Sequence, residues 1–138
     1  KVYRENGQYT GLGFHGVPGG HEFTSFILGL YNASGSGQSI DEAVKTRIEN
    51  VKEPIDMKVL VSLSCTMCPD LVVAAQKMAT LNDNITSEVY DVMNYEDLKS
   101  KYNVQSVPCL VINDKDISFG KKNIEQLVDL LAEKTGSI

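Results

Sequence analysis

The sequence contains few of the residue types on which several common kinds of site depend. Its 138 residues include three cysteines, two histidines and no tryptophan. Three cysteines are too few for a disulfide-stapled scaffold, and a structural zinc site needs four cysteine or histidine ligands, which usually come in paired motifs. The formal net charge of −5 also argues against a nucleic-acid partner, because domains that bind nucleic acid carry a basic surface.

Long apolar runs are missing as well. No stretch approaches the roughly 18 apolar residues that a membrane-spanning helix needs, so we expect no membrane partner. The opening residues, Lys1-Val2-Tyr3-Arg4, lead into polar sequence rather than into the apolar core of a signal peptide. Together with the low cysteine count, this predicts a cytoplasmic, reducing setting. The composition is 42% hydrophobic, and the length predicts one domain or slightly more.

Two of the three cysteines form a Cys-x-x-Cys motif, Cys65 to Cys68, at the point where a strand gives way to a helix. The preceding run, residues 57–61, is apolar and rich in β-branched side chains, which is typical of a buried strand. Residues 71–79 that follow have apolar side chains at helical spacing. A Cys-x-x-Cys in this context is the redox signature of thioredoxin-like proteins.

The motif predicts a division of labour between its two sulfurs. We expect Cys65 at the helix N-terminus, where unpaired N–H groups and the helix dipole stabilise a thiolate. Cys68 then lies one turn further along the same face and can close an intramolecular disulfide. Cys65 is therefore the predicted attacking sulfur and Cys68 the resolving sulfur of thiol–disulfide exchange. Pro69 suits the first helical turn. An inert structural disulfide and half of a zinc site are the alternatives.

From residue 55 onward the predicted elements follow the order of the thioredoxin fold, β-α-β-α-β-β-α. This is an α/β fold with a mixed sheet and helices on both faces. The predicted strands are residues 57–61, 85–92, 109–112 and 116–119, and the predicted helices end near residues 81, 102 and 133. Residues 55–138 are accordingly assigned to a redox-active thioredoxin-like domain.

The first part of the chain repeats the end of that pattern. Residues 2–5 and 8–14 flank Asn6-Gly7, a strong signal for a β-hairpin. A helix is predicted from Glu22 to about residue 32, because five apolar residues share one face: Phe23, Phe26, Ile27, Leu30 and Tyr31. Residues 1–35 are thus interpreted as part of a second thioredoxin-like unit, a hairpin plus helix without cysteines, whose first half is absent from this sequence.

A hairpin with one helix is too small to be stable alone. We therefore expect it to pack on the residues that follow or on a part that this sequence lacks, and apolar surface left exposed there could drive formation of a homodimer. Residues 36–54 are assigned to a linker and a connecting helix. The linker is residues 33–38, and Ser39 with Glu42 forms a capping box that predicts the helix start.

Residues 11–16 match the dinucleotide-binding pattern Gly-x-Gly-x-x-Gly, but a cofactor site is not expected there. The glycines begin inside a predicted hairpin strand, and no helix opens directly after them. We interpret them as glycines that permit turning and close packing.

Three segments resemble the N-terminal domain of the flavoprotein subunit of bacterial alkyl hydroperoxide reductase: Val17-Pro18-Gly19-Gly20-His21-Glu22-Phe23-Thr24-Ser25, Ser62-Leu63-Ser64-Cys65-Thr66-Met67-Cys68-Pro69-Asp70 and Ser106-Val107-Pro108. The resemblance runs nearly end to end. In that family two thioredoxin-like folds are fused, and only the second keeps its cysteines. Relative to the family, this sequence lacks the start of the first fold and the flavin- and nicotinamide-binding module after the second.

The resemblance implies a specific route for electrons. The Cys65–Cys68 pair would accept electrons from a dithiol on a flavoprotein reductase module and then reduce the disulfide of a partner peroxiredoxin. FAD and NADH or NADPH would belong to the missing or partner module, and none to this chain. One alternative is a general thioredoxin- or glutaredoxin-like protein disulfide reductase, and the other is a docking domain without enzymatic activity.

The resemblance also assigns roles to two residues outside the motif. Glu22 matches a family glutamate near the redox centre, which would assist proton transfer to or from Cys68; its alternative role is that of a carboxylate that complements a helix dipole. Pro108 matches the cis-proline that faces the cysteines, where it would shield the thiols from metal ions and present the backbone of Val107 to a substrate. Cys109 departs from the small apolar residue usual in the family, and we interpret it as a buried small hydrophobe, with a place close to the redox pair as the alternative.

Overall fold

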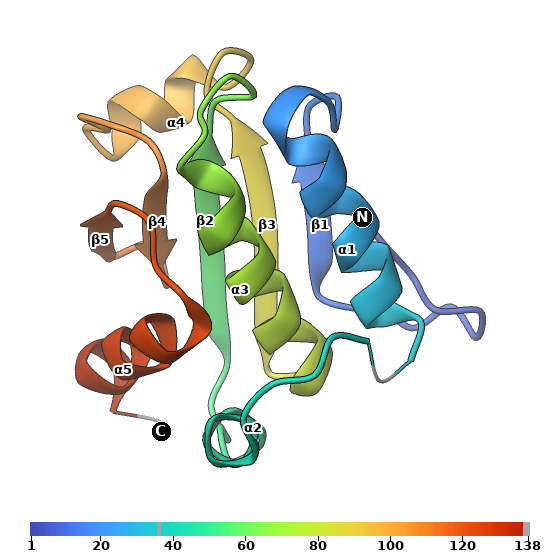
Figure 1. Cartoon of the computed structure of the whole chain (residues 1–138). Helices are drawn as coiled ribbons and strands as arrows, with labels where there is room; N and C mark the ends of the chain where they lie inside the picture. Colours follow the sequence, from blue (N-terminus) through green and yellow to red (C-terminus); the bar gives the residue numbers. More distant parts are fainter. Residues whose placement is uncertain (36, 137–138) are drawn as a thin grey trace.

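One five-stranded mixed sheet runs through the chain, whose computed structural model describes residues 1–35 and 37–136 (Figure 1). The strands lie in the order β1-β3-β2-β4-β5. β1 and β2 both pair in parallel with β3, whereas β4 pairs antiparallel with β2 and β5. Their bounds are β1 Leu12–His15, β2 Ile55–Val61, β3 Ile85–Asp91, β4 Cys109–Ile112 and β5 Asp116–Phe119.

Helices cover both faces of this sheet, as the sequence predicts. Along β4, Leu110 and Ile112 belong to the larger core cluster together with α2, α3 and α5, while Cys109 and Val111 belong to a second cluster on the opposite face, against which α4 packs. Side chains of a strand alternate between faces, so the two clusters mark the two sides. The helices are α1 Phe23–Ala33, α2 Glu42–Glu49, α3 Cys68–Leu81, α4 Glu96–Lys101 and α5 Ile124–Thr135, and a 3-10 turn, η1, spans Gly20–Glu22. None of the helices in residues 1–35 and 37–136 is long and apolar enough to cross a bilayer.

The central strand β2 carries the site at its carboxyl end. Its last three residues, Val59, Leu60 and Val61, have no exposed surface, since helices lie above and below it. α3 follows β2 directly and lies across the middle of the sheet between α1 and α5 (Figure 1). The loop between β2 and α3 therefore lies at the carboxyl end of the central strand, flanked by η1 and by the segment that leads into β4.

The predicted N-terminal hairpin is wrong in its details. Only one antiparallel bridge, Tyr3 with Tyr9, joins its two arms. Gly11 has a φ of +85°, a left-handed conformation that interrupts an extended strand. The regular strand consequently starts only at Leu12, where it pairs with β3. Backbone hydrogen bonds still join the two arms, since Val2 N–H donates to the Leu12 carbonyl and Arg4 N–H to the Gln8 carbonyl, both at 2.8 Å.

The predicted start of α2 is also wrong. The N-cap is Asp41, whose Oδ1 accepts a hydrogen bond of 2.8 Å from Ala43 N, so the helix begins two residues later than a Ser39 cap would place it. Two residues capable of capping compete here, and the aspartate takes the free N–H. The helix ends at Glu49, before Pro54, as predicted. Ser36, which belongs to the predicted linker, lies outside the described residues.

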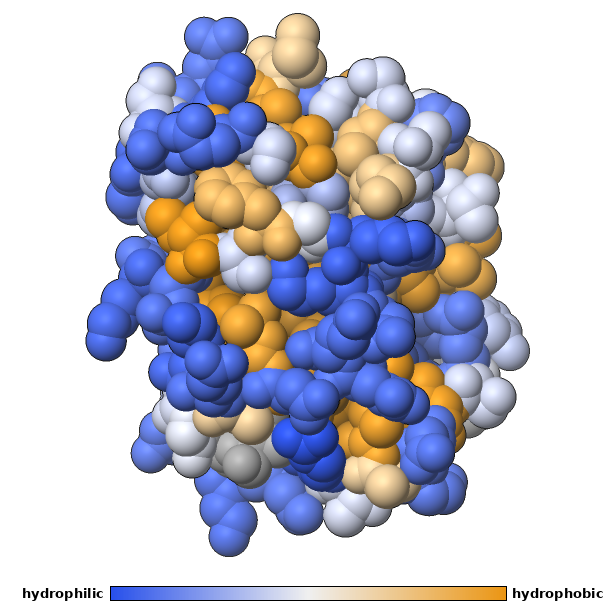
Figure 2. All heavy atoms as spheres, turned by 60° about the vertical axis from the view of Figure 1, so that its left-hand side comes forward, coloured by the Kyte–Doolittle hydropathy of each residue, from blue (hydrophilic) through white to orange (hydrophobic). Residues whose placement is uncertain are grey.

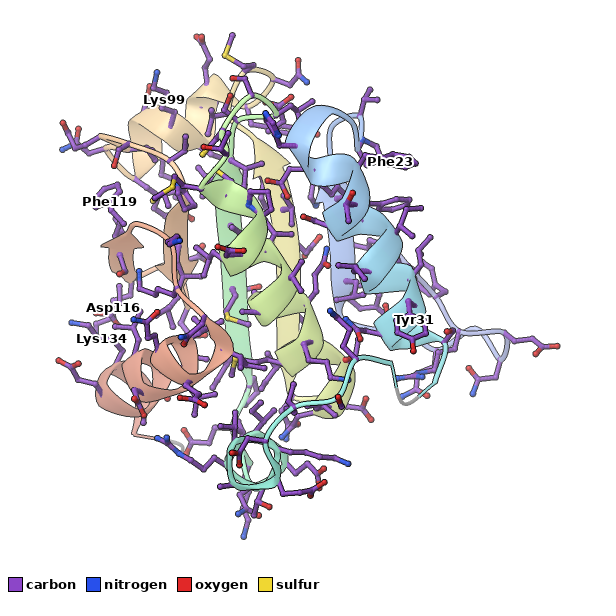
Figure 3. All side chains as sticks on the ribbon, viewed as in Figure 1. Phe23, Tyr31, Lys99, Asp116, Phe119 and Lys134 are labelled. Atoms are coloured by element: carbon purple, nitrogen blue, oxygen red, sulfur yellow. The ribbon has the colours of Figure 1, made fainter. Side chains whose placement is uncertain are left out.

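The predicted helix α1 is present, but most of its apolar face points to solvent. Phe23 is 56% exposed, Ile27 45% and Tyr31 55%, and Figure 3 shows Phe23 pointing away from α3. The helix instead packs on α3 through residues that include Ser25 and Gly29. A Cβ atom at Gly29 would lie 2.8 Å from Gln76 Oε1 on α3, so small residues allow the two helices to approach closely.

Candidate active site

Cys65 and Cys68 lie between β2 and α3, where the sequence predicts them, but Cys65 precedes the helix. α3 begins at Cys68, and Cys65 belongs to a turn in which its N–H donates to the Ser62 carbonyl at 3.0 Å. The prediction that Cys65 lies at the helix N-terminus, with Cys68 one turn inside, is therefore wrong by about one turn, because Cys68 is the first residue of α3. The reason is local: residues 62–67 form successive turns that deliver the chain into the helix, and Pro69 takes the first-turn position that suits it.

The two thiols differ sharply in their surroundings. Cys65 is partly exposed and Cys68 has no exposed surface, and both are in the thiol form. Burial raises the pKa of Cys68 far above its ordinary value, and the hydrogen bond with Cys65 and the charge of Glu22 add to the rise. Cys68 consequently remains a protonated thiol at neutral pH. Because Cys65 is partly exposed, it is the accessible sulfur of the pair. A thiol must ionise to attack, so the protonated Cys68 needs a base before it can react.

The segment before β4 faces the accessible sulfur. The Cys65 thiol donates to the Val107 carbonyl at 3.9 Å, and the Val107–Pro108 peptide bond is cis, as the sequence predicts. Pro108 is buried and Val107 is partly exposed. The backbone of Val107 therefore borders the surface on which a disulfide of another protein would meet Cys65. The catalytic part of Pro108 stays a prediction.

Glu22 is brought to the other side of the pair by η1. Its side chain has no exposed surface, and it makes no capping hydrogen bond to the helix that it precedes. Burial raises the pKa of Glu22, an effect that Ser25 partly offsets, and the charge of Glu22 raises the pKa of Cys68. A buried carboxyl near a buried thiol can exchange a proton with it. The roles of Glu22 in proton transfer and as a carboxylate that complements the helix dipole both stay predictions.

Gly20 holds this glutamate in place, a role that sequence reasoning missed. It has a φ of +55°, and a Cβ atom there would lie 2.5 Å from the Leu63 carbonyl oxygen. The next residue, His21, donates its N–H to the same carbonyl at 2.8 Å. The Gly19-Gly20 pair was the available signal, because such glycines permit close approach of two backbones, but the partner of that approach is 43 residues from Gly20 along the chain.

Cys109 does not belong to the site, although it follows Pro108. Its side chain is fully buried in the second core cluster with Leu60 and Val111, on the opposite face of the sheet from Cys68. Burial raises its pKa to about 11. The interpretation as a buried small hydrophobe fits this position, and the alternative of a place beside the redox pair does not.

The surroundings of the cysteines give the zinc alternative no support. In residues 1–35 and 37–136 there is no group of three or more His, Cys, Asp or Glu side chains that could hold a metal ion. A structural zinc site needs four such ligands.

A groove of about 750 Å³ opens beside the first turn of α3. α1 contributes Ser25 and Leu28 to its lining and α3 contributes Pro69 and Val73. Lys121, which precedes α5, and Ile124, the first residue of α5, complete it. Pro69, which follows Cys68 in the sequence, lines the groove, whereas Cys65 and Cys68 do not. No sequence pattern predicts this groove, because its walls combine residues of α1, α3 and α5 with the segments that precede α2 and α5.

The comparison with protein families gives a direct match to this fold. The family described as "Thioredoxin domain" matches residues 55–132. The chain belongs to the thioredoxin domain family. A curated relative from Bacillus subtilis, "NADH dehydrogenase", is 32% identical over 94% of this chain but only 25% of its own length. This chain therefore spans about a quarter of that relative.

Two solved structures are similar over most of the chain. The NTD_N/C domain of alkylhydroperoxide reductase AhpF from Enterococcus faecalis has a TM-score of 0.87 and 33% identity, over 92% of this chain and 61% of that one. A protein disulfide oxidoreductase from Aeropyrum pernix has a TM-score of 0.80 and 25% identity, over 90% and 55%. These matches confirm the resemblance to the N-terminal domain of the alkyl hydroperoxide reductase flavoprotein.

Proposed function

We propose that this chain is a thiol–disulfide oxidoreductase module that relays electrons from the dithiol of a flavoprotein module to the disulfide of a partner protein, a peroxiredoxin. The observation that carries the proposal is the unequal pair at the end of β2. Cys65 is accessible beside the Val107 carbonyl, while Cys68 is buried and protonated next to Glu22. This is the arrangement that a two-step exchange requires.

The first step uses the accessible sulfur. The Cys65 thiolate attacks one sulfur of the partner disulfide, a mixed disulfide forms, and the other partner sulfur leaves as a thiolate. In the second step Cys68 gives its proton to Glu22 and attacks the Cys65 sulfur. The bond between Cys65 and the partner breaks, the Cys65–Cys68 disulfide forms, and the partner has gained two electrons. A dithiol on the flavoprotein module then reduces Cys65–Cys68 by the reverse sequence.

The flavin and the nicotinamide belong to the other module in this proposal. The name of the Bacillus subtilis relative, "NADH dehydrogenase", supports NADH as the source of electrons for the longer protein. The present chain supplies the thiols, the buried acid and the Val107 backbone. FAD bound to the flavoprotein module would carry electrons from the nicotinamide to that module's dithiol.

Trapping of the mixed disulfide tests the proposal. Cys68→Ser keeps the attacking sulfur and removes the resolving one, so we expect it to accumulate a disulfide-linked complex with an oxidised peroxiredoxin. Cys65→Ser should give no complex, and Cys109→Ser, the matched control, should turn over like the unmodified protein. The products are separated on a non-reducing gel and located by mass spectrometry. Equal trapping by the Cys68 and Cys65 variants, or none by either, would contradict the assignment.

A general protein disulfide reductase is the second candidate, and the similarity to the Aeropyrum pernix protein disulfide oxidoreductase favours it. The electron donor separates the two. Reduction of Cys65–Cys68 by NADH and a flavoprotein, with much slower reduction by glutathione, is expected of the relay. Comparable rates with glutathione, or equal activity on unrelated disulfide proteins such as insulin, would favour the general reductase.

A further inference from the structure

Ser25 stands out among the groups around the site because it is a buried hydroxyl for which the exchange steps give no role. Glu22 and Ser25 are 0% and 1% exposed, and a separation of three residues places them on one face where η1 runs into α1. That face packs against α3, whose first residue is Cys68. Among the described residues, both carboxylate oxygens of Glu22 and the Ser25 hydroxyl are buried without a hydrogen-bond partner.

A buried carboxyl can act as a base only if its ionised form is stabilised. Desolvation disfavours the ionised form, whereas a donated hydrogen bond favours it. Ser25 carries a buried, unpartnered hydroxyl on the same face as the unpartnered Glu22 carboxyl, and it lowers the pKa of Glu22 that burial raises. A hydroxyl is also small enough for the close contact between α1 and α3.

We propose that Ser25 is a positioning residue for proton transfer at Cys68: its hydroxyl donates a hydrogen bond to ionised Glu22 and so sets the pH at which Glu22 accepts the Cys68 proton. The inference rests on the proposed function. During resolution the Cys68 proton moves to a Glu22 oxygen, while the Cys68 electron pair forms the bond to Cys65. The partner sulfur leaves with the pair from the broken disulfide. Ser25 keeps its own proton throughout.

Other titratable groups on the neighbouring elements lie elsewhere or have partners of their own. On α3, Asp70 is 65% exposed and lies 3.8 Å from Lys121, which precedes α5, and the pKa of Lys77 is lowered by burial and by the charge of Lys45. On β1, His15 Nε2 lies 2.7 Å from Glu88. His21, on η1 itself, is exposed. The charge of Glu22 raises the pKa of Cys68.

Titration of the Glu22 carboxyl tests the inference without any partner protein. The carboxylic acid C=O infrared band of Glu22, identified as the band lost in Glu22→Gln, is followed against pH in the unmodified protein and in Ser25→Ala. Loss of a hydrogen bond to a charged group is expected to move the midpoint upward by about one pH unit. An unchanged or lower midpoint overturns the inference. The titration does not depend on activity, so its result holds even if the protein fails to reduce any disulfide and the proposed function fails.

The rate of mixed-disulfide resolution gives the second readout. Ionised Glu22 is the active form, so the rising limb of the pH–rate profile should move to higher pH by the same amount in Ser25→Ala. Ser25→Ala should have no further effect in the Glu22→Gln background. If Ser25→Ala shifts the pH–rate profile equally in the Glu22→Gln background, the inference is overturned, because the effect of Ser25 would then not act through Glu22.

A matched control uses the neighbouring hydroxyl. Thr24→Ala removes an exposed hydroxyl from the same helix and groove, and it should leave both midpoints in place. Ser25→Thr keeps the donor and should restore the original midpoint. A Thr24→Ala shift as large as that of Ser25→Ala would show a general effect of the helix and would overturn the inference. Circular dichroism melts confirm that each variant is folded.

Discussion

At the scale of single residues, the site depends on how differently the fold treats similar groups. Cys65, Cys68 and Cys109 are the same side chain in three settings: at the surface, buried beside an acid, and buried in the opposite core cluster. The Cys-x-x-Cys spacing predicted the first two roles. The resemblance placed Glu22 near the redox centre, but no local pattern indicates its burial, because it results from a contact between η1 and a loop that is distant in the sequence.

The raised pKa of Glu22 has a consequence for stability. Burial, partly offset by Ser25, raises its folded-state pKa above the ordinary value of 4.5. The stabilisation from protonated Glu22 is fully present below that ordinary value and is lost as the pH rises through the folded-state pKa. We expect Glu22→Gln, which cannot ionise, to be more stable than the unmodified protein at neutral pH. Urea unfolding at a series of pH values measures the difference.

The difference between Glu22→Gln and the unmodified protein should shrink towards zero below pH 4.5, the ordinary value, because Glu22 is then protonated in both the folded and unfolded chains. Other groups titrate alike in the two proteins and cancel. A gap that stays constant over the whole pH range would mean that the substitution acts through packing alone.

Gly20 is the residue whose backbone makes the site possible. Gly20→Ala combines a left-handed φ of +55° with a Cβ atom 2.5 Å from the Leu63 carbonyl oxygen. We expect it to lower the free energy of unfolding by about 2 kcal/mol and to slow resolution by Cys68, since η1 and Glu22 must shift. Gly35→Ala is the control, because nothing lies within 4 Å of a Cβ atom there. Equal stabilities of the two variants in urea unfolding would contradict this account.

At the scale of elements, the sequence predicted the bounds of a helix or strand correctly where its apolar spacing and the flanking turn residues indicate the same limits. Strands β4 and β5 have the predicted bounds, and α3 ends at Leu81 as predicted, since their apolar spacing and flanking turns agree. The predicted bounds were wrong where a residue adopts a left-handed backbone conformation or where a second residue can act as the N-cap. Gly11 breaks the first hairpin and Asp41 replaces Ser39 as the cap of α2; neither outcome changes the apolar pattern from which the elements were predicted.

The cap of α2 can be tested directly. Asp41 Oδ1 accepts the Ala43 N–H at 2.8 Å, so Asp41→Ala should cost about 1 kcal/mol of unfolding free energy. Ser39→Ala should cost much less, because Ser39 is not the cap residue. Chemical denaturation of the two variants measures both values. A larger loss in Ser39→Ala would restore the capping box that the sequence predicted.

At the scale of the whole molecule, residues 1–35 extend the sheet rather than standing apart. β1 adds to β3, and α1 packs on α3. The interpretation of this segment as part of a second thioredoxin-like unit stays a prediction. One observation relevant to it is that the apolar residues of α1 face outwards, which sequence periodicity alone could not show, since periodicity finds a face but not what covers it.

The outward face of α1 and the side of the molecule that carries β5 and α5 differ in how their exposed apolar side chains are arranged. Phe23, Ile27, Leu30 and Tyr31 are each at least 38% exposed and lie on one helix. Figure 2 shows the side that carries β5 and α5, where apolar surface lies in separate patches among hydrophilic atoms. Exposed apolar side chains that gather on one helix favour association, so the α1 face is where we expect two copies of the chain to meet.

Substitution on this face tests the expected homodimer. Ile27 is 45% exposed, so Ile27→Glu should change the folded monomer little while it places a charge in the contact. We expect the unmodified chain to show a concentration-dependent dimer in sedimentation velocity, and Ile27→Glu to weaken that dimer at least about tenfold, the effect of roughly 1.4 kcal/mol. Ile117→Glu, at a position 38% exposed on β5, is the matched control and should sediment like the unmodified chain. A chain that remains monomeric at every concentration, or a dimer that Ile117→Glu weakens as much as Ile27→Glu, would show that α1 is not the contact.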